Sequence, residues 1–393
     1  MTESPVSVIT PPWGVYLHVP WCHRRCPYCD FYFEVGAAHP RFASGIAAEL
    51  HARRQEAPSA PAQSLYFGGG TPSLLPDATL SELIDQLRGV PLADDVEVTL
   101  EANPEDLGPG RIAQLAKSGI NRLSLGVQSF DDDVLAWLGR AHRGADARRV
   151  LEEAVAAGIP RVSIDLICGV PGESRDRLDN DVEQAMQLGV GHLSTYLLTV
   201  EPNTPLVQLI RAGKRAAVDD DRQADAYERL QELLPENGLL QYEISSFALR
   251  GHESRHNRLY WSKGSYLGLG PGAHSMRFLS DGAVVRRHTT AKVEQWLDDP
   301  AAAPFEEEHL SPVEAFAEAI AFGLRDMRSG VDVHRMAERH GVGVPTALLE
   351  MLAAAAAAGR IENDDKCARL TALGARFGDA IAADALYAAS QEA

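Results

Sequence analysis

Cysteine and positive charge are both scarce in this chain, and it has no long apolar run. Only 5 of its 393 residues are cysteine, which argues against a disulfide scaffold and favours the reducing cytoplasm, as does the lack of a recognisable targeting segment. Lysine and arginine number 37 against 55 aspartate and glutamate, and the net charge of −18 argues against a general nucleic-acid-binding protein. No stretch approaches the roughly 20 apolar residues of a membrane span, so any membrane contact would be peripheral.

Three of the five cysteines lie close together. They are separated by three and then two residues in an aromatic-rich loop, and are Cys22, Cys26 and Cys29. This spacing favours a [4Fe–4S] cluster held by three thiolates, which leaves one iron open to a small molecule. The alternative is a zinc site in which His23 or Asp30 supplies the fourth ligand. Cys168 and Cys367 stand alone in the sequence, and we do not expect them to be ligands.

Short apolar runs alternate with segments of helical periodicity along the first half of the chain. Nearly continuous apolar or β-branched runs are typical of strands buried on both faces of a parallel sheet. We expect six such strands, at 15–19, 64–67, 96–101, 122–127, 162–167 and 192–198, with helices between them, for example at 40–55, 132–157 and 175–188. The alternation predicts an α/β fold, and six units predict a partial (β/α)6 barrel rather than a closed barrel of eight.

Polar residues follow the ends of these predicted strands. The cysteine loop follows the first strand, the glycines at 68–70 follow the second, and Glu101 ends the third. The next three strands are followed or interrupted by Gln128, Asp165 and Glu201. In parallel barrels the working face lies at the C-terminal ends of the strands. We therefore expect these residues to form a ring of ligand contacts around the cluster.

Several motifs together resemble the radical S-adenosylmethionine (SAM) superfamily. The cysteine triplet is accompanied by YFGGGTP at 66–72 and EANP at 101–104. The sequence is more closely similar to the branch that contains oxygen-independent coproporphyrinogen III oxidase (HemN) and the heme chaperone HemW. This similarity extends through GVQSF at 126–130, LGRAH at 138–142, DLICGVPG at 165–172, YEIS at 242–245 and HNRLYW at 256–261, and covers residues 14–290.

The resemblance also implies which residues bind the cofactors. The three clustered cysteines would hold the [4Fe–4S] cluster. SAM would be contacted by Tyr16, Gly69, Gly70, Thr71, Glu101, Gln128, Arg140 and Asp165. Heme would bind at the HNxxYW motif through His256, Asn257, Tyr260 and Trp261, with His256 as the iron ligand. The alternatives to His256 as the ligand are His142, His252 and His274.

Two departures from the oxidase pattern favour the HemW branch. Asp30 follows the triplet where the oxidase has a further cysteine, and the first cluster cysteine lies only 21 residues from the start. We therefore expect a cytoplasmic heme chaperone that binds heme, a cluster and SAM, accepts electrons from a low-potential donor and delivers heme to client hemoproteins. The alternatives are oxidative decarboxylation of coproporphyrinogen III and radical methyl transfer that uses a second SAM.

The resemblance, together with one compositional break, divides the chain into three predicted parts. Residues 1–235 would form the radical SAM core, and residues 236–298 an extension that carries the HNxxYW motif. An Asp-, Pro- and Ala-rich linker at 298–304 would lead to a HemN-type C-terminal domain at 305–393. Helical patterns followed by short strand patterns predict a small, mostly helical, winged-helix-like fold there. Residues 301–393 hold 8 Lys/Arg against 15 Asp/Glu, which argues against DNA binding, so we interpret this domain as a cover or an interaction surface.

Overall fold

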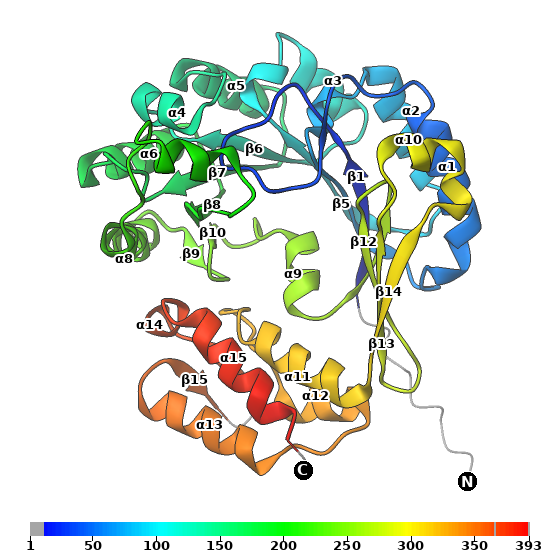
Figure 1. The fold of residues 1–393 in the computed structure, drawn as a ribbon, viewed down its shortest axis with the longest axis vertical. Coiled ribbons are helices and arrows are strands. Elements are labelled where there is room, and N and C mark those ends of the chain that lie inside the picture. The colour runs from blue at the N-terminus through cyan, green and yellow to red at the C-terminus, as the bar shows by residue number, and fades with distance from the viewer. Residues whose placement is uncertain (1–11, 365–366, 392–393) are drawn as a thin grey trace.

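The computed structural model describes residues 12–364 and 367–391. Residues 1–11, 365–366 and 392–393, which belong to the predicted first and last domains, lie outside this described part. A curved twelve-stranded sheet organises the chain, and the C-terminal helices lie beyond its open side (Figure 1). None of the helices in the described ranges is long and apolar enough to cross a membrane.

The six central strands of the sheet run parallel, and most of their side chains are buried on both faces. Each strand lies within a few residues of its predicted position. They are β1 (Trp13–Val19), β4 (Ala62–Gly69), β5 (Leu92–Ala102), β6 (Arg122–Gln128), β7 (Arg161–Cys168) and β8 (His192–Leu197). Helices connect them, which confirms the predicted α/β class and the partial six-strand barrel.

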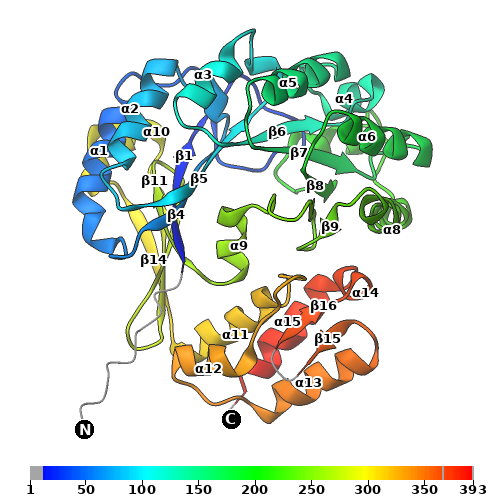
Figure 2. The same cartoon turned by 180° about the vertical axis from the view of Figure 1, so that it is seen from behind.

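Helices cover the convex face of these strands (Figure 2); the apolar sides of most of them complete one large core, and those of α4 and α7 pack into a smaller cluster beside it. They are α1 (Phe42–Arg53), α2 (Asp77–Leu87), α3 (Arg111–Lys117), α4 (Asp132–Leu138), α5 (Gly144–Ala156), α6 (Arg175–Gln187), α7 (Pro205–Arg211) and α8 (Asp220–Glu236). The prediction of one helical segment over 132–157 was wrong. Gly139, at φ +73°, ends α4 in a left-handed conformation that favours glycine, and the turn directs Arg140 and His142 toward the sheet.

Shorter strands extend the sheet at both edges, and the sequence pattern did not predict them. Because they are brief and rich in polar residues, they lack the apolar run that marked the central strands. They are β9 (Leu240–Gln241), β10 (Ser246–Ala248), β11 (Ser265–Leu269), β12 (His274–Phe278), β13 (Val284–Thr289) and β14 (Phe305–Leu310). The full order is β14-β13-β12-β11-β1-β4-β5-β6-β7-β8-β10-β9, in which β11 is parallel to β1 and β12 to β14 are antiparallel.

The segment expected to be a linker is largely structured. Helix α10 (Val293–Asp298) and the 3-10 helix η4 (Pro300–Ala302) precede β14, which is the edge strand of the main sheet. The cysteine loop contains a small parallel pair, β2 (Trp21–Cys22) with β3 (Glu34–Val35). The remaining 3-10 helices are η1 (Arg54–Glu56), η2 (Pro72–Leu74) and η3 (Pro104–Asp106). The domain boundaries themselves stay a prediction.

A second hydrophobic core lies in the C-terminal helices. Its elements are α11 (Pro312–Gly323), α12 (Val333–His340), α13 (Thr346–Ala357), α14 (Ala372–Ala375), α15 (Gly378–Ala389) and the hairpin of β15 (Ile361–Asn363) with β16 (Ala368–Leu370). Helix α9 (Arg255–Trp261), which carries the HNxxYW motif, lies between this group and the sheet (Figure 1).

A buried charged side chain joins α1 to the edge extension of the sheet. The Arg53 guanidinium donates to Glu49 (2.9 Å), to the carbonyl oxygen of Gly268 (2.7 Å) and to the hydroxyl of Ser275 (2.9 Å). The side chains of Arg53 and Glu49 are each only 3% exposed. Removing one partner of such a buried pair leaves the other charge without compensation, which is strongly destabilising.

We expect Arg53→Met to lower the free energy of unfolding by about 3–5 kcal/mol, because Glu49 and Glu56 lose their ion pairs with Arg53 and one group each of β11 and β12 loses a donor. The matched control is Arg54→Met, since Arg54 is exposed and donates only to Gly89; we expect a change within about 0.5 kcal/mol. Urea unfolding followed by circular dichroism measures both. Equal midpoints for the two variants would contradict this role of Arg53.

Candidate cluster and cofactor site

A cavity of about 860 Å³ lies at the C-terminal ends of the parallel strands. The cysteine triplet lines it from one side. Seven of the eight residues predicted to contact SAM also line it, and these are Gly69, Gly70, Thr71, Glu101, Gln128, Arg140 and Asp165. The eighth, Tyr16, lies behind the wall, where its hydroxyl is 3.1 Å from His18 Nδ1. The structure thus brings residues from several strands and loops to one volume.

Each of two cluster cysteines has a hydrogen-bond donor at its sulfur. The Thr71 hydroxyl donates to Cys22 Sγ (3.3 Å) and Arg140 donates to Cys26 Sγ (3.5 Å). Burial raises the pKa of Cys22 to about 11 and also raises the pKa of Cys29. Because thiolates are the ligands, cluster insertion must displace these protons, and the two donors then stabilise the sulfur charge. Within the described ranges, no three His, Cys, Asp or Glu side chains, the cysteine triplet included, are gathered closely enough to hold a metal ion.

Two glycines let the chain pass very close to its neighbours at the cavity wall. Gly69 has φ +107°, and a Cβ there would lie 2.6 Å from the His18 ring. A Cβ on Gly70 would lie 2.7 Å from the carbonyl oxygen of Trp21. Any larger residue would push the strand end away from the cysteine loop. The glycines at 68–70 are therefore more than a turn, because they set the spacing between β4 and the cluster ligands.

Two half-buried carboxylates, Glu101 and Asp165, face the cavity from β5 and β7. Glu101 accepts from the Tyr66 hydroxyl (2.7 Å) and from the Gly69 amide (3.2 Å). Burial raises the pKa of Glu101 to about 7, which the hydrogen bond from Tyr66 partly offsets, and burial raises the pKa of Asp165 to about 6. Such carboxylates are suited to accept from ribose hydroxyl groups and to attract a cationic ligand.

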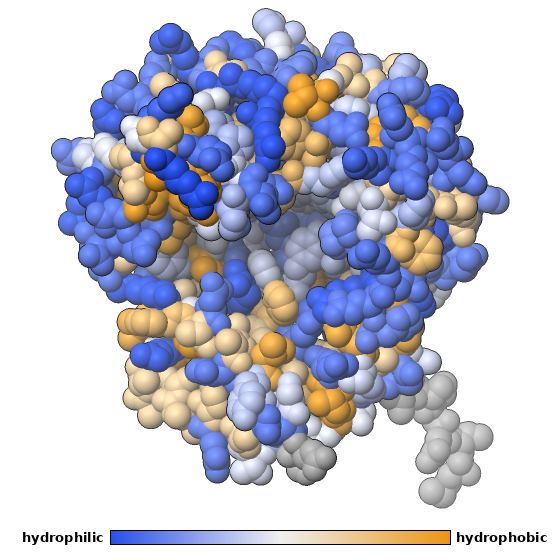
Figure 3. All heavy atoms as spheres, in the orientation of Figure 1, coloured by the Kyte–Doolittle hydropathy of each residue, from blue (hydrophilic) through white to orange (hydrophobic). Residues whose placement is uncertain are grey.

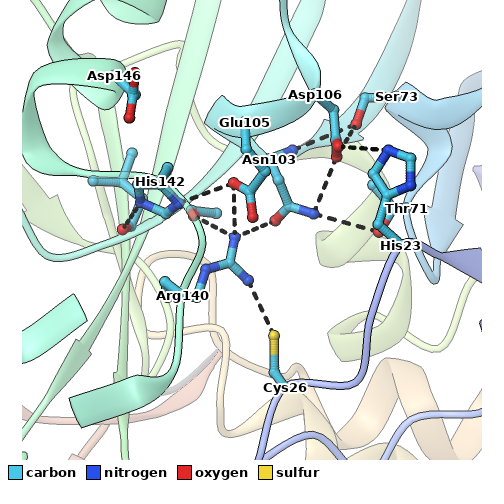
Figure 4. A network of polar contacts seen from close by, with 12 residues as sticks. His23, Cys26, Thr71, Ser73, Asn103, Glu105, Asp106, Arg140, His142 and Asp146 are labelled. Carbon is cyan, nitrogen blue, oxygen red and sulfur yellow. Dashed lines mark hydrogen bonds and ion pairs between the residues drawn. The ribbon is translucent and has the colours of Figure 1, made fainter. Parts of the chain in front are cut away.

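A polar network that sequence reasoning largely missed supports the far wall (Figure 4). Arg140 donates to the side-chain oxygen of Asn103 and lies 3.6 Å from Glu105. His142 lies 2.9 Å from Glu105 and 2.9 Å from the carbonyl oxygen of Val127. Although burial raises it, the bond to His142 and the charge of Arg140 hold the pKa of Glu105 down at about 2. Asn103 lies within the EANP motif, so its position was a usable signal.

Gln128 has a backbone conformation that is uncommon for a residue with a side chain. Its φ is +66°, and the pairing of β6 with β7 shifts between Leu125 and Gln128. Non-glycine residues rarely take this region, and such strain is concentrated at functional sites. Here it turns the side chain of Gln128 into the cavity as the strand ends.

The HNxxYW motif does not present its four predicted heme residues on one surface. His256 is fully buried, with Nδ1 2.8 Å from the Ser64 hydroxyl and Nε2 3.0 Å from the Tyr260 hydroxyl. Its ring stacks on Tyr66 at 4.8 Å, and burial lowers its pKa to about 3. In this conformation neither ring nitrogen can reach an iron atom. Ligation by His256 stays a prediction, and it requires α9 to move.

The other residues of the motif face different surroundings. Asn257 lines a small polar cavity of about 40 Å³ below Glu101 and Asp165. Trp261 points the opposite way and stacks on Phe322 of α11 at 6.3 Å. The motif thus supports the floor of the main cavity on one side and contacts the C-terminal helices on the other.

Comparison with known proteins places the chain in a family. Residues 16–185 match the radical SAM superfamily, and residues 310–377 match the HemN C-terminal domain. The heme chaperone HemW of Mycobacterium tuberculosis (strain ATCC 25618 / H37Rv) is 44% identical over 67% of this chain and 69% of that protein. HemW of Bacillus subtilis (strain 168) is 32% identical over 94% of this chain and 97% of that protein. This chain belongs to the HemW family of radical SAM proteins.

The solved structure of coproporphyrinogen III oxidase (HemN) from Escherichia coli shares the fold of this HemW-family chain. Its TM-score is 0.79 over 96% of this chain and 90% of that one, at 22% sequence identity. A radical SAM protein uses a [4Fe–4S] cluster and SAM, and the cavity described above fits both. It provides three thiol ligands, donors to two of the sulfurs and two half-buried carboxylates for a cationic ligand. When reduced, the cluster would supply the electron that cleaves SAM.

We expect replacement of Cys22, Cys26 and Cys29 by alanine to abolish the brown iron–sulfur absorbance of anaerobically purified protein. Cys168→Ala and Cys367→Ala are the controls, since neither residue lines the cavity, and both should retain the absorbance. Iron and sulfide analysis measures the outcome. Unchanged iron in the triple variant, or stoichiometric zinc in the wild type, would show that the ligand assignment is wrong.

Affinity for SAM should fall as pH is lowered from 8 through 7 toward 6. The raised pKa values of Glu101 and Asp165, about 7 and about 6, mean that these carboxyls become neutral in this range and stop attracting the sulfonium. We expect Glu101→Gln to weaken binding about tenfold at pH 8 and to remove the upper part of this dependence. The control is Asp94→Asn on the exposed start of the same strand. Calorimetry on cluster-loaded protein measures both, and a flat wild-type profile would contradict the assignment.

Proposed function

We propose that this chain is a heme chaperone, which binds heme, a [4Fe–4S] cluster and SAM and delivers heme to client hemoproteins. The observation that carries this proposal is the 32% identity with a protein named heme chaperone HemW over 97% of that protein's length. The cavity supports it, because all three cluster cysteines and the SAM-facing residues line one volume. The low cysteine content of this chain suits the cytoplasm, where the chain would meet client hemoproteins and a low-potential electron donor.

The position of the HNxxYW helix suggests how heme, cluster and client contacts communicate. Helix α9 contacts β1 and β4 on one side and α11 on the other. Lys263 and Arg325 add cation–π contacts to the aromatic rings at this junction, at 4.1 Å and 4.7 Å from the ring centroids. A movement of the cavity floor would therefore shift α9 and, through it, the C-terminal helices. We interpret these helices as a cover or a client-facing surface.

The enzyme alternative is oxidative decarboxylation of coproporphyrinogen III. It gains support from the shared fold with HemN, but at 22% identity this similarity concerns the fold alone. Radical methyl transfer with a second SAM is a further use of the same scaffold. Each of these two reactions would consume SAM in a fixed ratio to a porphyrin or other product. Heme delivery by a chaperone would form no such product.

The discriminating experiment uses anaerobically reconstituted full-length protein in two parallel assays. In the first, hemin-loaded protein is mixed with an apo-hemoprotein, and we expect heme to move to the client, visible as a shift of the Soret band. In the second, the protein is incubated with coproporphyrinogen III, SAM and reductant, and we expect no protoporphyrinogen by chromatography. The triple cysteine variant controls for cluster dependence. Robust protoporphyrinogen formation would overturn the proposal in favour of the oxidase.

A further inference from the structure

Four histidines were candidate heme ligands by sequence, and the structure separates them. Both ring nitrogens of His256 and of His142 are engaged by protein partners inside the core. His252 packs against Gly191, just before the start of β8, and so lies at the end of the barrel opposite the cysteine loop. His274, on β12, is exposed. It alone of the four combines an exposed side chain with ring nitrogens that have no hydrogen-bond partner among the described residues.

His274 forms a stacked pair with His288 on the neighbouring strand. The two residues are directly opposite in the β12–β13 ladder, and their rings lie 4.0 Å apart and 2° from parallel. Within the described residues, neither imidazole makes a hydrogen bond or an ion pair. Although part of the ring is exposed, its enclosed part and the neighbouring His288 and Arg286 lower the pKa of His274, which favours the neutral ring with a free lone pair.

The pair lies on the same face of the sheet as the cofactor cavity. Tyr66 of β4 is opposite Tyr16 of β1, and Tyr16 is opposite Gly268 of β11. The pairing of β11 with β12 places Gly268 opposite His274, and His274 is opposite His288 of β13. Neighbours in one row point to one face, because side chains alternate along each strand. The other face is covered by α1, whose Arg53 bonds Ser275. Figure 3 shows the molecular surface hollowed at the centre, between the sheet and the C-terminal helices.

The cysteine loop contacts the turn that precedes His274. A Cβ on Gly272 would lie 2.5 Å from the ring of Tyr32, so this ring packs on the turn between β11 and β12. Tyr32 follows the last cluster cysteine closely in sequence, and its carbonyl oxygen lies 3.1 Å from His18 Nε2. A ligand at His274 would therefore border the cluster loop and the wall that holds Gly69.

We propose that the imidazole of His274, with His288 stacked against it, is the axial ligand through which this chain holds heme iron on the inner face of β12 and β13. This inference rests on the proposed function, since it names the site of the heme that a chaperone would carry. The lone pair of one ring nitrogen binds the iron in place of water, and no electron is transferred. His288 is a positioning residue that fixes the plane of the ligating ring.

Heme iron suits this pair better than a bare metal ion. Two imidazoles that share one metal at about 2.0–2.1 Å must converge on it, whereas these rings are parallel and 4.0 Å apart. A single axial bond needs only one accessible nitrogen, which the exposed imidazole of His274 offers. A neighbouring aromatic ring, Tyr266, is half-buried on the adjacent strand, opposite Met276.

The test is an anaerobic hemin titration of the full chain, followed in the Soret region. We expect His274→Ala to weaken hemin binding at least about tenfold and to change the spectrum, and free imidazole to restore the wild-type spectrum. His288→Ala should shift the band with a smaller loss of affinity. The matched control is His309→Ala, because His309 is exposed on β14 and its register with Val285 places it on the opposite face; it should bind as the wild type does. Circular dichroism confirms folding of each variant.

Each alternative result has a distinct meaning. Wild-type protein that takes up no hemin would overturn the proposed function and leave no heme site to assign. Hemin binding that is unchanged in both His274→Ala and His288→Ala would overturn this inference alone. His256→Gln, which keeps the size and polarity of that buried side chain, separates the two sites. Loss of the heme spectrum in His256→Gln with no change in His274→Ala would assign the iron to the HNxxYW motif after a movement of α9.

Discussion

The half-buried carboxylate of Glu101 links the floor of the cavity to the glycine turn. It is held by the Tyr66 hydroxyl and by the amide of Gly69, and Tyr66 in turn stacks on His256 of α9. Gly69 is pressed against His18, which bonds the backbone of the cysteine loop at Tyr32. The cavity floor, the glycine turn and the cluster loop therefore depend on one chain of contacts. A half-buried charge needs such partners, because an unpaired carboxylate in this setting would be costly.

This arrangement gives the HNxxYW motif a structural meaning that does not depend on heme. His256 fills the space beneath Tyr66, and Trp261 reaches the C-terminal helices at Phe322. One short helix thus connects the SAM-facing wall with the domain that closes the open side of the sheet.

The edge extension of the sheet has a different role from the parallel core. Strands β11 and β12 are anchored by Arg53, whose contacts lie on the face that α1 covers. On the opposite face, α11 packs against Met276 and Val284, and Arg286 pairs with Glu318 of α11. The stacked imidazoles of His274 and His288 lie on this second face, where His274 stays exposed. The two faces of the edge extension therefore have different surroundings.

The sequence by itself determined the six parallel strands, the α/β class, the family, the cysteine triplet and seven of the eight SAM candidates that line the cavity. Those features depend on local patterns: apolar runs, the cysteine spacing, and glycines at positions whose backbone conformation requires glycine. Tertiary structure alone decided where α4 ends at Gly139, that β11 to β14 join the sheet, and that Glu105 supports Arg140. It also decided that His256 is enclosed while His274 is exposed. Accessibility depends on what packs against a side chain from distant parts of the chain, and no local motif records that.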